Sequence, residues 1–128
     1  MLLQLSDRSS EPLYSQISRQ LRALVLAGEL NEDDALPSIR AFAREHRVSV
    51  ITVQRAYEDL EKEGLLHTRR GKGFFVSRLT DRRRGDLARR RFEEAVSPIV
   101  DGALAEGLDA SEVKRIMDDM LARREGDR

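Results

Sequence analysis

Residues 36–62, LPSIRAFAREHRVSVITVQRAYEDLEK, predict a short helix, a tight turn and a longer helix. On a helical wheel of residues 49–62, the apolar side chains share one face at the i, i+3, i+4, i+7 spacing of a packing surface: Val53, Ala56, Tyr57 and Leu60. Ser38, directly after Leu36-Pro37, and Ser49 each stand where a helix N-cap is expected. Two capped helices joined by so short a turn indicate a helix-turn-helix.

The opposite face of the longer helix has a different chemistry. It presents Ile51, Arg55, Glu58 and Lys62, with Thr52 and Gln54 at its sides. Arginine can read guanine, glutamine can read adenine, and an aliphatic group can contact a thymine methyl in a major groove. A helix considered alone favours an ordinary solvent-facing scaffold over DNA reading, and it is the neighbouring capped helix that makes this face indicate DNA reading.

Elements on both sides of this stretch complete a small domain. Residues 11–27 predict a core-facing helix, with Pro12 in its first turn and Gly28 at its end. Residues 29–35, ELNEDDA, predict a solvated acidic loop. After Gly64, the segments LLHT and FFV predict two short strands around RRGKG, whose basic side chains suit phosphates or a narrow minor groove.

In order along the chain, LPSIRAFA, VSVITVQRAYEDLEKEGLL and RRGKGFFV resemble the winged helix-turn-helix domain of the GntR family of bacterial transcription regulators, over roughly residues 11–76. Three departures stand out. Arg47 replaces a turn glycine, so a left-handed backbone is expected there. Glu32-Asp33-Asp34 replaces a proline-glycine pair, and Phe74 replaces a small hydroxyl residue in the wing.

The resemblance implies DNA contacts at Arg40, in the recognition helix and in the wing, and we add Arg55 because it points outward. Together with the cap serines and the basic wing, the expected DNA-binding set is Ser38, Arg40, Ser49, Val50, Ile51, Thr52, Gln54, Arg55, Arg69, Arg70, Gly71, Lys72 and Gly73. The valine-isoleucine pair predicts an operator rich in thymine-methyl contacts.

Residues 78–128 predict a helical tail, distinct from the DNA-binding domain at residues 1–77. Its basic start, DRRRGDLARRR at residues 81–91, is either a solvated helix face or linker or a contact to the DNA backbone. Pro98 predicts a kink or two shorter helices, and Asp109 with Glu112 predicts a capping box. We expect a dimerisation surface made of Phe92, Val96, Ile99, Leu104, Val113, Ile116, Met117, Met120 and Leu121. So few residues cannot bury these faces alone, which favours a homodimer.

Composition narrows the function classes. The net charge is zero, but residues 36–76 carry eight basic and five acidic side chains, so the positive charge is concentrated in the middle segment. With no cysteine and only His46 and His67, we expect no metal site and no cofactor. No catalytic constellation is apparent, so we expect no enzyme. No apolar run reaches membrane-spanning length, which predicts a cytoplasmic protein without membrane contact.

These observations predict a mainly α fold with a small β-hairpin wing, followed by a short α-helical dimerisation domain. The short tail resembles the YtrA-type subfamily of GntR regulators. This resemblance implies a transcriptional repressor that binds double-stranded DNA at an inverted repeat as a homodimer. It also implies that the regulated genes form a transporter operon. The alternative is a winged-helix adaptor that binds proteins rather than DNA. The tail methionines either fill a core or adapt around an unknown small-molecule effector.

Overall fold

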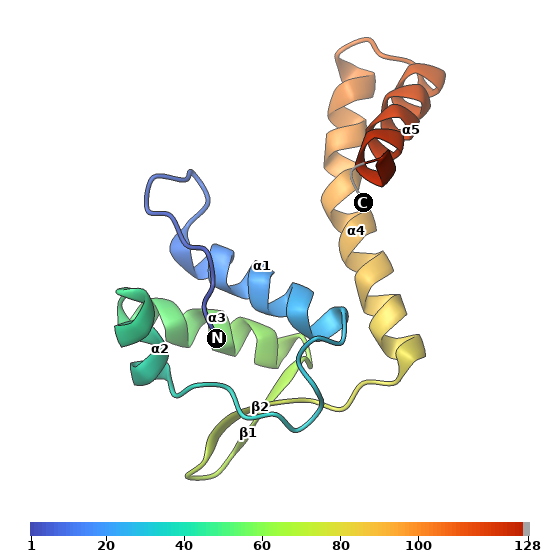
Figure 1. Ribbon diagram of the computed structural model, residues 1–128. Helices are drawn as coiled ribbons and strands as arrows, with labels where there is room; N and C mark the ends of the chain where they lie inside the picture. The colour runs from blue at the N-terminus through green and yellow to red at the C-terminus, as the bar shows by residue number, and fades with distance from the viewer. Residues whose placement is uncertain (127–128) are drawn as a thin grey trace. The chain divides into compact units, whose positions relative to one another are not determined.

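A computed structural model describes residues 1–126 of the chain. Five helices and one two-stranded sheet follow one another in the described residues as α1(Leu13–Leu26), α2(Ile39–His46), α3(Val50–Lys62), β1(Leu66–Arg69), β2(Gly73–Val76), α4(Asp81–Ala105) and α5(Ala110–Gly126). The expected mainly α fold with a β-hairpin is confirmed (Figure 1). One compact unit covers Met1–Gly85, and a second begins at Asp86, inside α4. Among residues 1–126 no helix has both the length and the apolar character that crossing a bilayer requires.

The core of the first unit lies between α1 and α3, with α2 packed against α3. Helix α1 starts directly after Pro12, which occupies the N-cap position, and Gly28 follows its end with a φ of 78°. The largest fully buried side chains come from all three helices and from the hairpin and the residue before it: Ile17, Leu21, Val25, Phe42, Val53, Tyr57, Leu60, Leu65, Leu66 and Val76.

Both helices of the helix-turn-helix are capped as expected. The Ser38 hydroxyl accepts a hydrogen bond from the Ala41 N–H at 3.1 Å, and the Ser49 hydroxyl accepts one from the Thr52 N–H at 3.1 Å. Between the helices, Arg47 has a φ of 55° and a ψ of 46°, the left-handed conformation predicted at this turn. The turn therefore closes without the usual glycine, at a cost of about 1–2 kcal/mol.

The aromatic ring of Tyr57 joins the helix-turn-helix to the wing. Its hydroxyl donates to the Pro37 carbonyl at 2.9 Å, and its ring makes a T-shaped contact with the Phe74 ring at a centroid distance of 5.2 Å. Phe74, where the resemblance to the family leads one to expect a small hydroxyl residue, thus extends the core beneath the hairpin. Burial raises the pKa of the Tyr57 hydroxyl well above its usual range, so it remains a hydrogen-bond donor.

A third, short segment pairs with the hairpin of the wing, which the sequence did not predict. Strands β1 and β2 pair antiparallel from Leu66–Val76 to Arg69–Gly73. The acidic connector pairs with the other edge of β2: the Asp33 N–H donates to the Val76 carbonyl at 2.8 Å, and the Leu36 N–H donates to the Phe74 carbonyl at 2.9 Å. Residues 29–35 are a loop with largely exposed side chains, as predicted, but β2 satisfies the backbone groups of its last residues, which the sequence did not predict.

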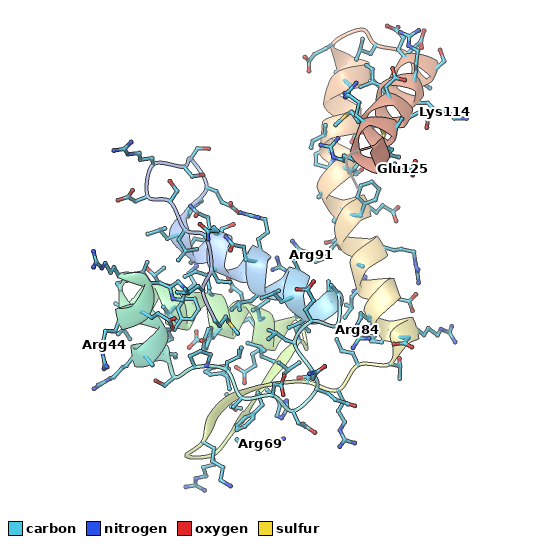
Figure 2. The ribbon with its side chains drawn as sticks, viewed as in Figure 1. Arg44, Arg69, Arg84, Arg91, Lys114 and Glu125 are labelled. Atoms are coloured by element: carbon cyan, nitrogen blue, oxygen red, sulfur yellow. The ribbon has the colours of Figure 1, made fainter. Side chains whose placement is uncertain are left out.

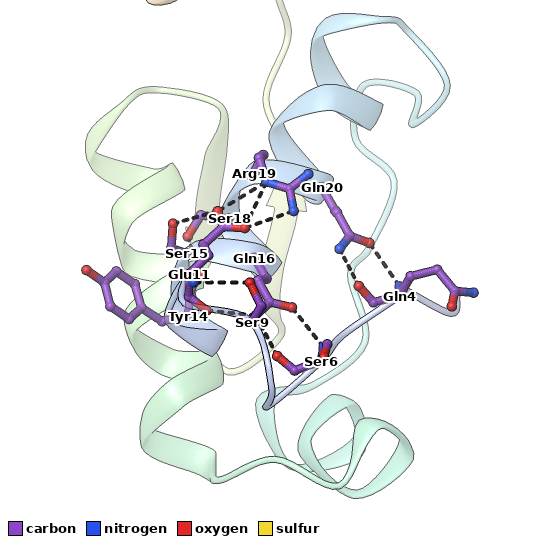
Figure 3. Close-up of polar contacts among 10 residues, drawn as sticks. All are labelled: Gln4, Ser6, Ser9, Glu11, Tyr14, Ser15, Gln16, Ser18, Arg19 and Gln20. Atoms are coloured by element: carbon purple, nitrogen blue, oxygen red, sulfur yellow. Dashed lines mark hydrogen bonds and ion pairs between the residues drawn. The ribbon is translucent and has the colours of Figure 1, made fainter. Parts of the chain in front are cut away.

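Residues 1–10 have no clear period in the sequence; the first six lie along α1 as an arm, and a turn follows before the helix begins. Gln16 donates to the Ser6 carbonyl at 2.8 Å and accepts from its N–H at 2.9 Å. Gln20 makes the same reciprocal pair with the backbone of Gln4 (Figure 3). The Leu3 N–H donates to His46 Nε2 at 3.0 Å, which reaches from the arm to α2. Glutamine side chains thus replace the neighbouring strand that an extended segment normally requires.

The second unit consists of most of α4 and all of α5. Helix α4 runs without interruption through Pro98, so the alternative of two shorter helices is wrong. At the start of α5 the Asp109 carboxylate accepts from the Glu112 N–H at 2.9 Å, and the Glu112 carboxylate accepts from the Asp109 N–H at 3.3 Å. This reciprocal pair confirms the capping box. Neither helix has a buried side chain.

Candidate nucleic-acid interface

The first turns of α3 present an exposed mixed surface. Ile51 is 78% exposed and Val50 44% exposed, although both are large apolar residues. Thr52 beside them is half-buried, and its hydroxyl lies 2.7 Å from that of Ser49. These exposed branched apolar side chains at the start of a capped helix suit contact with thymine methyls.

Gln54 and Arg55 continue this surface in different directions. The Gln54 side-chain amide donates to a Glu58 carboxylate oxygen at 2.9 Å, one turn further along the same exposed face. Arg55 is exposed as predicted, but its guanidinium carbon lies 3.5 Å from the centre of the Tyr14 ring of α1. The cation–π contact holds Arg55 at the α1 side of α3. Sequence spacing could not identify Tyr14 as its partner.

Three of the predicted basic contacts have side chains without a hydrogen bond or ion pair within residues 1–126: Arg40, Arg70 and Lys72. Arg40 is exposed in the first turn of α2, and the other two flank Gly71 at the tip of the wing. Gly71 and Gly73 have φ values of 74° and 95°, which a side chain rarely tolerates, so the tight tip requires glycine. These cations are available for phosphate.

Arg69, on β1 of the hairpin (Figure 2), is different from its neighbours. Its Nη2 donates to Asp33 Oδ1 at 2.9 Å, and its guanidinium carbon lies 4.2 Å from the centre of the Phe75 ring. The sequence pointed to Arg69 as a cation but did not reveal its carboxylate partner. The acidic residues in place of the usual proline-glycine pair were the only signal.

The cap serines have well-defined structural roles. The Ser38 and Ser49 hydroxyls each accept a backbone N–H of their helix, and these bonds account for the placement of serine at both positions. A serine that accepts this cap bond still has its O–H group, which could donate to a phosphate oxygen, so contact with a phosphate at either position stays a prediction.

The predicted dimerisation residues form an apolar surface in the second unit. The exposed fractions of their large side chains are high: Phe92 59%, Ile99 71%, Leu104 45%, Ile116 44%, Met120 39% and Leu121 57%. Val96, Val113 and Met117 are half-buried. A shallow apolar groove between α4 and α5 is lined by Val100, Leu104, Val113 and Met117, among others. The two helices cover only part of each other, which leaves an apolar face uncovered.

Comparison with protein families matches residues 13–76 to the model of "Bacterial regulatory proteins, gntR family". The matched segment starts at α1 and ends at β2, so it contains the helix-turn-helix and the hairpin.

Individual proteins agree with this match. The chain is 41% identical over 76 residues to the HTH-type transcriptional repressor YtrA of Bacillus subtilis, which covers 59% of this chain and 58% of that protein. The chain thus spans well under two thirds of that relative's length. Among solved structures, YtrA from Sulfolobus acidocaldarius, a GntR-family transcription factor, matches with a TM-score of 0.59 and 30% identity, over 76% of this chain and 99% of that one. The DNA-binding domain of AraR in complex with operator ORE1 matches with a TM-score of 0.50 and 26% identity, over 60% of this chain and 94% of that one.

Proposed function

Because the chain belongs to the GntR family of bacterial regulatory proteins, we propose that it is a transcriptional repressor that binds double-stranded DNA as a homodimer. Each protomer would place the start of α3 in a major groove of an inverted repeat and its wing tip in the flanking minor groove. The B. subtilis relative is a repressor, which supports repression, and the AraR domain is bound to an operator, which supports binding to DNA.

One observation carries the proposal: a capped helix presents Ile51, 78% exposed, beside Gln54, on the same unit as a basic wing tip. The apolar and amide groups supply base contacts, whereas Arg70 and Lys72 supply phosphate contacts that do not depend on sequence. A protein-binding adaptor would explain an exposed isoleucine but does not require unpaired cations at the wing tip.

The second copy of the chain is the proposed occupant of the apolar face of α4 and α5. Six large apolar side chains are at least 39% exposed on these helices, which is costly in water. Association through a two-fold axis would cover the same face on both protomers and fix the spacing of the two recognition helices. An effector in the α4–α5 groove would compete for the same apolar contacts.

The test is selection of bound duplexes from a random DNA library with the purified protein, repeated over a salt series. We expect an enriched inverted repeat with half-sites about one helical turn apart, and with thymines facing Ile51. Affinity should fall steeply with salt, since Arg40, Arg70 and Lys72 would displace counterions from phosphates. Absence of enrichment at every salt concentration would contradict sequence-specific DNA binding and favour the adaptor.

The same selection experiment can also identify the genes that the protein regulates. A regulator of this kind would act on chromosomal DNA in the cytoplasm, and the selected consensus can be mapped onto the host genome. The resemblance to YtrA-type regulators predicts that the mapped site lies beside transporter genes. Sites beside unrelated genes would contradict that part of the proposal without affecting the DNA-binding mechanism.

A further inference from the structure

Asp33 connects two arginines at the base of the wing. Its Oδ1 accepts from Arg69 Nη2 at 2.9 Å, and its Oδ2 lies 3.4 Å from both Nε and Nη2 of Arg78. The Arg78 Nε is also 3.5 Å from a Glu32 carboxylate oxygen. Two carboxylates and two guanidinium groups thus form one cluster with no net charge.

The backbone holds Asp33 in this position. Its N–H donates to the Val76 carbonyl at 2.8 Å, and the next carbonyl, that of Asp34, accepts from the Val76 N–H at 2.9 Å. Asp33 has a φ of 66°, a left-handed conformation that aspartate tolerates better than most residues but that glycine adopts without strain. The carboxylate is therefore attached to the sheet of the wing itself, and its presence is not required by the turn.

The partner of Asp33 is restrained as well. The Arg69 guanidinium lies over the Phe75 ring at 4.2 Å while it donates to the carboxylate. A phosphate approaching Arg69 would meet the negative charge of Asp33 at nearly the same distance as the positive charge. Arg70 and Lys72, one and three residues further along, have no such neighbour.

We propose that Asp33 withholds Arg69 from DNA phosphates and so confines the charge contacts of the wing to its tip. This inference rests on the proposed DNA-binding function and adds a residue that limits affinity for DNA of any sequence. A wing base with a free arginine would bind every duplex more tightly, because phosphate contacts carry no sequence information.

The experiment measures binding of the full chain to the selected operator and to a duplex without it, over a salt series. Asp33→Asn removes the charge and keeps a residue suited to the left-handed backbone. We expect several-fold tighter binding of both duplexes by the same factor, and a salt slope steeper by about one counterion. Glu32→Gln is the matched control, because it removes the same charge from the adjacent residue without touching Arg69.

Arg69→Ala completes the test. In the wild-type background it should change affinity little, and combined with Asp33→Asn it should abolish the gain. Asp33→Gly should reproduce Asp33→Asn, and thermal unfolding should show that each variant is folded. Equal affinities of Asp33→Asn and Glu32→Gln, or weaker binding by Asp33→Asn, would overturn this inference alone. Failure of the wild-type chain to bind any duplex would contradict the proposed function and this inference with it.

Discussion

Ile51 and Gln54 would read DNA in physically different ways. Ile51 offers only an apolar surface, so it can favour a thymine methyl but cannot orient the helix. Gln54 can make two directed hydrogen bonds, and its amide is already oriented by Glu58 at 2.9 Å. An i, i+4 pair of this kind contributes about 0.2–0.5 kcal/mol, whereas a bidentate contact to adenine discriminates by about 1–3 kcal/mol. The base contact is therefore strong enough to replace the internal bond.

Gln54→Ala should weaken binding to the selected operator by about 1–3 kcal/mol and relax the preference at one base position. Glu58→Ala serves as the matched control, since it removes the internal partner but leaves the amide, and the base preference should survive. Both variants are measured by repeating the duplex selection and by titrating the wild-type operator. An equal loss on all sequences for Gln54→Ala would identify it as a phosphate contact instead.

Residues differ in how well the sequence predicted their environment, according to how far away their partners lie. The left-handed backbone of Arg47, the serine caps and the core face of α3 follow from neighbours within one or two turns, and the structure confirms them. Asp33 and Arg69 are 36 residues apart, and their pairing depends on the register of the connector against β2. Such long-range pairings have no local pattern in a single sequence.

Helix α5 illustrates how a local motif can define an element. Its capping box satisfies two backbone N–H groups at its start, and Ser111 also donates to the Asp109 carboxylate at 2.8 Å. The backbone N–H of Glu112 is the main cause of a pKa of Asp109 below its usual range. For α4, by contrast, the local rule at Pro98 left two alternatives open, and the structure excludes two helices.

The capping box predicts a specific pH dependence. Because the folded state lowers the pKa of Asp109, its carboxylate stabilises α5 fully above the usual aspartate pKa of about 4, and this contribution is lost as the pH falls through the lowered value. Asp109→Asn keeps a good N-cap but cannot ionise, so amide exchange at the start of α5 should lose this acid-dependent step. An identical pH profile in both proteins would show that Asp109 does not control this end of the helix.

The two units of the chain differ in how far their apolar side chains are buried. Residues 1–85 contain every buried apolar residue of the described chain, including Tyr57 and Phe42, whereas α4 and α5 contain none. The first unit therefore has a core of its own. The second unit has apolar side chains but buries none of them, as is expected of a helix pair whose core forms only when it packs against a second copy.

Ile116→Asp should convert the proposed dimer to a monomer, because a carboxylate at a residue 44% exposed in the free chain would become buried and unpaired at the interface. Ala122→Asp adds the same charge on the opposite side of α5 and should leave the dimer intact. Sedimentation velocity gives the oligomeric state, and operator titration should show much weaker binding by Ile116→Asp alone. A surviving dimer would place the interface elsewhere.

The glutamine side chains that hold the N-terminal arm determine where an expression fragment of the first unit should begin. A fragment cut at residue 13, where the match to the family starts, would leave Gln16, only 3% exposed, without both of its bonds to Ser6. Each of these hydrogen bonds contributes about 0.5–1.5 kcal/mol of net stability, so their joint loss is a noticeable part of the stability of a small domain. His46 would also lose its bond to Leu3. Fragments for crystallisation or operator titration should therefore keep the first residues, and affinity tags belong at the other end.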